Sequence, residues 1–147
     1  MTGIALIASE FPVSLLEPVI DRLHDRGGCP EVRFQSWHNP PLLPVRFDGA
    51  LRLLQWGSHD RRSPLPHGGL LTRQQMEAGM LADVDEAVIP ANYGYQHGVW
   101  FMIEEGVRGV VVPEAGVVYV LMEPATNYYR NMTGQSALMP VLVNQVI

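Results

Sequence analysis

Glycine and proline divide this chain into short segments, and that division constrains the fold more than any other feature of the sequence. There are 14 glycines and 12 prolines among the 147 residues. Both residue types interrupt regular elements and favour turns, so the chain holds short strands and helices joined by many turns. This pattern predicts a β-rich or α+β fold. The length and the 47% hydrophobic content are typical of one domain with a filled core, which we expect to span residues 1–147.

A strand, a tight turn and a second strand are predicted near the middle of the chain. Residues 88–89 and 99–103 are apolar runs of β-forming residues, and residues 90–94 contain the turn formers Pro, Asn and Gly. Polar side chains, among them Gln96 and His97, follow the turn formers. A turn between two buried strands is a place where a scaffold presents polar side chains to a ligand.

The remaining elements follow from shorter signals. Asp48-Gly49 is a strong hairpin signal between two apolar runs. Apolar residues recur at helical spacing from Phe11 to Arg26, which predicts the clearest helix of the chain. Further strands are predicted at 3–8, 43–47, 50–56, 107–112 and 117–122, an extended segment at 32–45, a mobile loop at 58–69, and short helices at 74–82 and 127–132.

All ten basic residues are arginines, because the sequence contains no lysine. The absence of lysine excludes chemistry that passes through a lysine Schiff base. The formal net charge of −5 argues against strong non-specific binding of nucleic acids, which depends on neutralising phosphates. A local cluster of arginines could still bind a nucleic-acid strand.

Metal, cofactor and membrane sites are not indicated. Cys29 is the one cysteine, which excludes an intrachain disulfide and a cysteine-based metal site. The five histidines lack ligand spacing, and the acidic residues Asp83, Asp85 and Glu86 are more typical of a solvated face than of a metal site. No apolar run reaches the ~18 residues of a spanning helix, and no signal peptide is indicated. We therefore expect a cytoplasmic protein without metal or cofactor.

Short motifs occur in a fixed order along the chain, and their order is more specific than any one of them. They are Met1-Thr2-Gly3, Asn39-Pro40-Pro41, Trp56-Gly57, Arg73, Pro90-Ala91, Tyr95, Ala125-Thr126-Asn127 and Met139-Pro140-Val141-Leu142. In this order the chain resembles the SOS-response-associated peptidase (SRAP) family, whose members sense abasic sites and crosslink to single-stranded DNA. The resemblance covers most of the chain. It implies a single α+β domain with a curved, partly barrel-like antiparallel sheet and short peripheral helices.

The resemblance also implies a pocket. The family uses an N-terminal cysteine as nucleophile, a glutamate and a histidine for proton transfer, and an asparagine near the sugar. The aligned positions here hold Thr2, Gln96, Ser136 and Leu71. The last three side chains do not move protons near pH 7, whereas an N-terminal threonine could offer its amine and hydroxyl. The chain thus resembles a degenerate member that keeps a pocket without crosslinking. His97, beside the lost acid, could serve as a base or be only a polar turn residue.

Candidate DNA contacts come from arginines and from tryptophans near polar residues. Arg61-Arg62 is the only adjacent basic pair and could contact phosphates, or it could be a solvated loop tip. Trp37 could stack on a base, or it could cover one end of the core. The full set of DNA-binding candidates is Trp37, Asn39, Trp56, Arg61, Arg62 and Arg73.

Three functions fit these observations. The first is binding of single-stranded or damaged DNA through a retained groove. The second is a non-enzymatic structural or interaction module, of the kind that phages and mobile elements encode, with a protein partner. The third is an enzyme that processes abasic sites with displaced catalytic residues around Gln96 and His97. Salt-dependent binding of single-stranded DNA separates the first function from the second.

Overall fold

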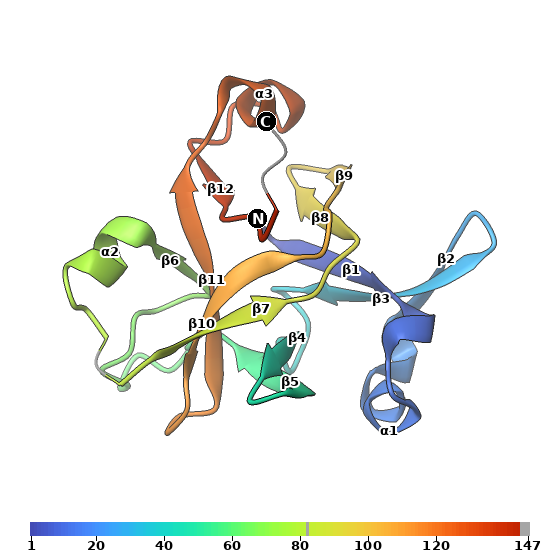
Figure 1. The fold of residues 1–147 in the computed structure, drawn as a ribbon, viewed down its shortest axis with the longest axis horizontal. Coiled ribbons are helices and arrows are strands. Elements are labelled where there is room, and N and C mark those ends of the chain that lie inside the picture. Colours follow the sequence, from blue (N-terminus) through green and yellow to red (C-terminus); the bar gives the residue numbers. More distant parts are fainter. Residues whose placement is uncertain (82, 145–147) are drawn as a thin grey trace.

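Short strands make up most of this α+β fold, and a few short helices lie around them (Figure 1). The computed structural model describes residues 1–81 and 83–144. The helices are α1 (Val13–Leu16), α2 (Arg73–Glu77) and α3 (Asn127–Met132), with 3-10 turns at Ala8–Glu10 and Glu17–Arg22. The strands are β1 (Gly3–Ile7), β2 (Leu23–Arg26), β3 (Cys29–Gln35), β4 (Leu42–Phe47), β5 (Ala50–Trp56), β6 (Leu70–Thr72), β7 (Asp85–Ile89), β8 (Tyr93–Gln96), β9 (Val99–Met102), β10 (Val107–Val112), β11 (Val117–Pro124) and β12 (Leu138–Pro140).

Five strands form a barrel-like sheet in the order β10-β7-β4-β5-β11, which closes because β11 also pairs with β10. Most neighbours run antiparallel, but β5 and β11 run parallel where Gln55 faces Val117. The contact between β4 and β7 is a single pair, Arg46 opposite Val88. Strands β6 and β12 extend the sheet by pairing with the later part of β11. The expected α+β class and barrel-like sheet are therefore confirmed.

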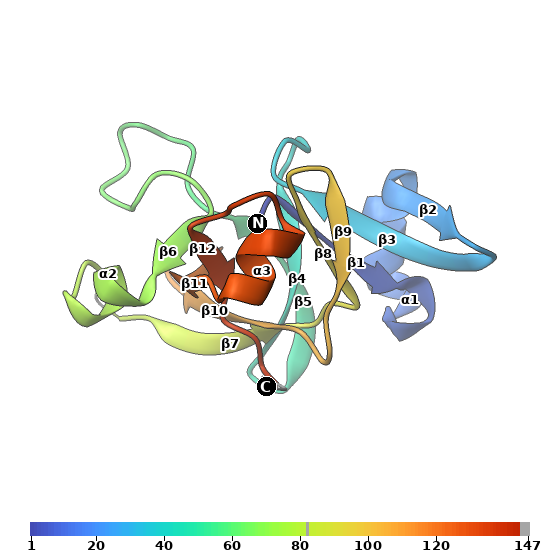
Figure 2. The same ribbon diagram turned by 90° about the horizontal axis from the view of Figure 1, so that it is seen from above.

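A second, five-stranded sheet has the antiparallel order β2-β3-β1-β8-β9. Its inner face carries buried side chains such as Ile4 of β1 and Phe34 of β3. These pack in one hydrophobic cluster with Val45 of β4 and Val118 of β11, so the two sheets share a core. Figure 2 shows α1 and the β2–β3 hairpin at one end of the molecule, and α2 with the loop before β6 at the other.

The helix predicted from Phe11 to Arg26 is wrong. Only Val13–Leu16 is α-helical; a 3-10 turn follows, and Val19 has a non-helical φ of −120°. The chain then becomes β2, which pairs with β3 across Gly27-Gly28. Pro18 lacks the N–H that a continuous helix would need, and the hairpin instead satisfies the later backbone groups.

The turn predicted at residues 90–94 is also placed wrongly. Residues 93–96 form strand β8, which pairs with β1 and β9. The tight turn lies at His97-Gly98, where φ is +48° and +79°. The reason is β1: the Thr2 N–H donates to the Tyr95 carbonyl (2.9 Å), which extends the sheet through the polar residues.

Other predictions hold. Asp48 and Gly49 connect β4 to β5 with φ of +53° and +73°, as the hairpin signal requires. The strands at 107–112 and 117–122 and the helix at 127–132 are confirmed. The helix predicted at 74–82 is shorter than expected and starts one residue earlier, at Arg73–Glu77, while residue 82 lies outside the described residues. Within the described ranges, no helix has the length and apolarity needed to cross a membrane.

We predict that Gly57→Ala destabilises the fold far more than Gly116→Ala. Both glycines have positive φ, +75° and +64°, so each alanine costs about 1–2 kcal/mol of backbone strain. A Cβ on Gly57 would also lie 2.0 Å from the Gly68 carbonyl oxygen, whereas a Cβ on Gly116 meets nothing within 4 Å. We expect a loss of unfolding free energy of at least ~3 kcal/mol for Gly57→Ala, measured by urea denaturation. Equal losses of unfolding free energy in the two variants would show that residues 68–69 move away from the new Cβ without cost.

Candidate functional site

One pocket gathers segments that are far apart in the sequence. Its volume is about 310 Å³. Figures 1 and 2 place the N-terminus beside β12 and near the β8–β9 hairpin. Antiparallel pairing causes this, because β1 lies along β8 and β12 lies along the end of β11. The lining residues are Met1, Leu70, Gln96, His97, Met122, Gln135, Ser136, Ala137 and Leu138.

Gln96 is one of the buried polar side chains of the pocket. It ends β8 on the inner face, and only 7% of its surface is exposed. Its Oε1 atom is buried and has no hydrogen-bond partner among the described residues. A buried amide oxygen is normally paired, so a group that enters the pocket with an N–H or O–H would find an acceptor here.

His97 follows Gln96 at the turn between β8 and β9. Its Nδ1–H donates to the backbone carbonyl of Thr133, 2.9 Å away. That bond fixes the tautomer of a neutral ring, so Nε2 carries the free lone pair and can accept a hydrogen bond. The imidazole is exposed, whereas Ser136 in the same pocket is buried and supplies a hydroxyl.

The N-terminal residue forms another part of the wall. Met1 is buried, and burial lowers the pKa of its α-amine from 8.0 to about 6. The Thr2 nitrogen is a peptide nitrogen whose N–H bonds Tyr95, and its hydroxyl lies 3.5 Å from the same carbonyl. Thr2 itself does not line the pocket. Leu71 stands at the position that the SRAP resemblance aligns with an asparagine. It is fully buried in a hydrophobic cluster with Val110 and Tyr119, while its neighbour Leu70 lines the pocket.

The DNA-binding candidates do not converge on one surface. Trp56 cannot stack on a base, because it is 2% exposed and its Nε1–H donates to the Gly69 carbonyl (3.0 Å). Arg61 and Arg62 are exposed in the loop before β6. Trp37 is 60% exposed, so the interpretation that it covers the core is wrong. Asn39 is exposed beside a cis peptide bond to Pro40.

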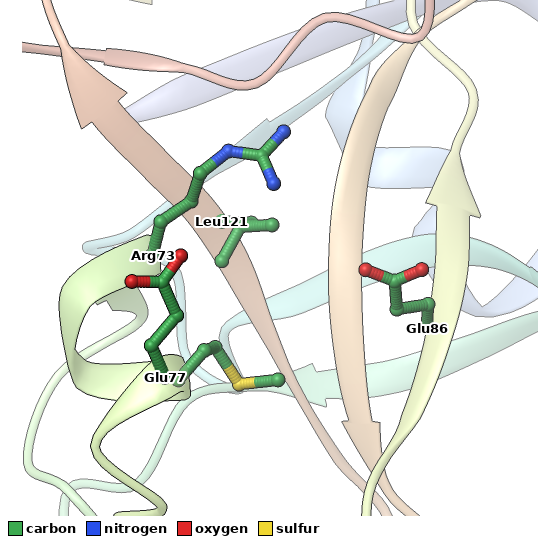
Figure 3. A pocket seen from close by; sticks show the side chains of 5 residues that line it. Arg73, Glu77, Glu86 and Leu121 are labelled. Carbon is green, nitrogen blue, oxygen red and sulfur yellow. The ribbon is translucent and has the colours of Figure 1, made fainter.

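Arg73 lies in a different and more acidic place. It starts α2 and lines a shallow hollow with Met76, Glu77, Glu86 and Leu121. Figure 3 shows the Glu77 carboxylate close to the Arg73 stem and Glu86 across the hollow. Two carboxylates around the same hollow reduce its attraction for a phosphate, so this place does not favour Arg73 as a DNA contact.

Sequence reasoning missed a cluster on the outer face of the five-stranded sheet. Tyr93 and Tyr95 of β8 and Trp100 of β9 lie there, with the rings of Tyr95 and Trp100 4.8 Å apart. Arg26 and Arg33 place their guanidinium carbons 4.0 Å from the Tyr93 ring centroid and 4.9 Å from that of Trp100, respectively. The alternation of Tyr93 with Tyr95 is a period-two signal that could have indicated this face.

Comparison of the chain with family models, curated proteins and solved structures found no match. Residues 1–81 and 83–144 contain no group of three or more histidine, cysteine or acidic side chains that could hold a metal. The pocket therefore offers an amide, a hydroxyl, an imidazole and the Met1 amine. The amide and the hydroxyl suit recognition through hydrogen bonds, while the imidazole and the amine are also of the kind that can transfer a proton.

We predict that Gln96→Glu lowers stability in a pH-dependent way. A carboxylate at this buried position would have a pKa above its usual value of about 4.3, because burial disfavours the charged form. Stability would then be close to wild type near pH 4.5 and would fall as the pH rises, by about 2 kcal/mol at pH 8. Urea unfolding at both pH values measures the change.

Gln135→Glu is the matched control, because Gln135 lines the same pocket but is exposed. We expect no pH-dependent loss for that variant relative to wild type. An equal loss at both pH values for Gln96→Glu would contradict the prediction. It would mean that the loss comes from removing the amide N–H donors and not from the charge of the new carboxylate.

Proposed function

We propose that this protein binds single-stranded nucleic acid non-covalently and takes one unpaired nucleotide into the pocket around Gln96. The observation that carries the proposal is the buried Oε1 of Gln96, which lines the pocket and has no partner among the described residues. An unpaired nucleotide brings N–H donors on its base, and a ribonucleotide also brings the 2′-hydroxyl of its sugar. Burying that oxygen away from water without a hydrogen-bond partner costs about 1–3 kcal/mol. A donor on a bound ligand would recover this cost.

The position of the pocket also supports a degenerate SRAP-like protein. The residues that the resemblance aligns with the family's acid and histidine, Gln96 and Ser136, line the same pocket as Met1. A flipped nucleotide is recognised in such pockets by hydrogen bonds and by packing against apolar side chains. Leu70 and Leu138 at the pocket wall are partly exposed and could provide that packing.

Two groups that could form a covalent bond are absent from the pocket, a cysteine thiol and a lysine amine, while the Met1 amine, whose pKa burial lowers to about 6, is present at its wall. The nucleophile of the resembled family is a cysteine thiol, but Cys29 is an exposed residue at the start of β3. The lysine that could form a Schiff base is absent from the sequence. Thr2 stands at the position aligned with that cysteine, and its nitrogen is a peptide nitrogen whose N–H donates to the Tyr95 carbonyl.

We predict salt-sensitive binding of single-stranded DNA without an adduct. Because the net charge is −5, we expect a dissociation constant of about 10 µM at low salt, rising as salt is added. Fluorescence anisotropy of a labelled oligonucleotide, with and without an abasic site, measures the binding. A denaturing gel of the same mixtures should show no covalent product. An adduct would instead support an active enzyme, and no binding at low salt would support an interaction module with a protein partner.

We further predict that Leu138→Glu weakens this binding and that Val13→Glu does not. Both side chains are exposed and both changes add one negative charge, but Leu138 lines the pocket and Val13 starts the remote helix α1. A carboxylate at the pocket would repel the phosphates of an entering nucleotide, so we expect about a tenfold weaker dissociation constant. The same anisotropy titration measures it. Equal weakening by the two variants would indicate a general charge effect and would remove the pocket from the proposal.

A further inference from the structure

The outer face of the five-stranded sheet carries a continuous layer of aromatic and arginine side chains. The sheet register places Tyr93 opposite Met102 and Tyr95 opposite Trp100. Where it pairs with β8, strand β1 contributes small residues to this face, Gly3 opposite Tyr95 and Ala5 opposite Tyr93. Side chains of β3 and β8 close over them. A Cβ at Gly3 would lie 3.1 Å from Gln35 and 3.3 Å from Tyr95, and Ala5 is fully buried.

A buried carboxylate fixes the two arginines of this layer. Glu31 is 2% exposed and accepts hydrogen bonds from Arg26 Nη2 and from Arg33 Nε, both at 2.9 Å. Burial alone would raise the pKa of Glu31, but the two guanidinium groups outweigh it and hold the pKa below its usual value. Two cations thus share one anion, and a positive charge remains among the rings of Tyr93 and Trp100.

Trp37 extends the layer toward the pocket. Its ring lies 6.3 Å from that of Tyr95 in an edge-on arrangement. Ser36, which precedes Trp37 in the sequence, donates its N–H to the Thr2 carbonyl, 3.0 Å away. Tyr95 and Gln96 are neighbours on β8 whose side chains lie on opposite faces of the sheet. The layer and the pocket therefore meet at the shared end of β1 and β8.

We propose that this aromatic face, formed by Trp37, Tyr93, Tyr95, Trp100, Arg26 and Arg33, stacks the bases of the strand that flanks the nucleotide in the pocket. Single-stranded nucleic acids bind to surfaces that combine aromatic rings with cations, and arginine planes also stack on bases. The inference rests on the proposed function. It adds a second surface, which lies on the opposite side of the sheet from Gln96.

The two arginines favour nucleic acid over another occupant. A proline-rich peptide can also lie on exposed aromatic rings, because its rings pack on them without needing charge. Here the guanidinium groups of Arg26 and Arg33 are held among the rings, and their excess positive charge complements a phosphate backbone. Trp37, with most of its surface exposed, provides the free ring for a first base.

The experiment compares variants of the aromatic face with matched variants elsewhere. The probe is a labelled oligodeoxythymidylate of about 15 nucleotides, followed by anisotropy at low salt. Trp37→Ser is paired with Tyr128→Ser, since Tyr128 is a 77% exposed aromatic residue on α3. Arg33→Gln is paired with Arg52→Gln, an exposed arginine on β5. Circular dichroism checks that each variant is folded.

We expect Trp37→Ser to weaken binding about tenfold, because removing one stacking ring has this order of effect. Arg33→Gln should also weaken it and should reduce its salt dependence, whereas both controls should stay within about twofold of wild type. Wild-type tryptophan fluorescence should be quenched by the oligonucleotide, and less so in Trp37→Ser.

The outcomes separate this inference from the proposed function. If wild type does not bind the oligonucleotide, the proposed function and the inference both fail. If wild type binds and Leu138→Glu weakens it, but Trp37→Ser and Arg33→Gln do not, only the inference fails. If the face instead binds decaproline in a way that Trp37→Ser abolishes and the oligonucleotide does not compete, the occupant is a peptide and the inference is overturned.

Discussion

Strand β11 is the element on which the rest of this structure depends. It closes the barrel by pairing with β10 on one side and β5 on the other, and its later part pairs with β12 and β6. Residues 117–122 are all buried, and alternate side chains enter two different hydrophobic clusters. A strand covered on both faces needs an unbroken apolar run, which is what the sequence has at this position. Met122 at the end of that run reaches the pocket, so barrel closure and the pocket wall are set together.

Side chains of β8 also alternate between two faces, and this alternation connects the pocket around Gln96 with the aromatic face. Tyr93 and Tyr95 lie on the outer face of the second sheet, while Gly94 and Gln96 are buried on the inner face. A strand places successive side chains on opposite faces, so a ligand that wraps around the end of β8 could contact both. Because β1 pairs with β8 on one side and β3 on the other, the position of Arg33 relative to Tyr93 depends on this pairing too.

Local signals in the sequence were sufficient for some elements and not for others. The hairpin at Asp48-Gly49 and the apolar strands β10 and β11 follow from turn chemistry and burial, which act within a few residues. The helix predicted from Phe11 to Arg26 is wrong because pairing between β2 and β3 replaced it, and helical spacing does not report such pairing. The alignment with the SRAP family grouped Gln96 and Ser136, which line one pocket here. The alternation of Tyr93 with Tyr95 indicates one face of β8, but the arrival of Arg26 and Arg33 at that face depends on the pairing of β2, β3, β1 and β8, which no single segment encodes.

The pocket around Gln96 holds a buried oxygen acceptor that carries no charge. A carboxylate at this position would be a buried charge, which is costly without a partner, whereas the amide of Gln96 provides an oxygen acceptor without that charge. That acceptor is buried without a partner among the described residues, although a fold can usually pair such groups cheaply. Had the position been only structural, an apolar residue would have packed there at a lower cost in free energy. The cost of this unpaired amide oxygen to the fold is the physical reason for treating Gln96 as a candidate binding residue.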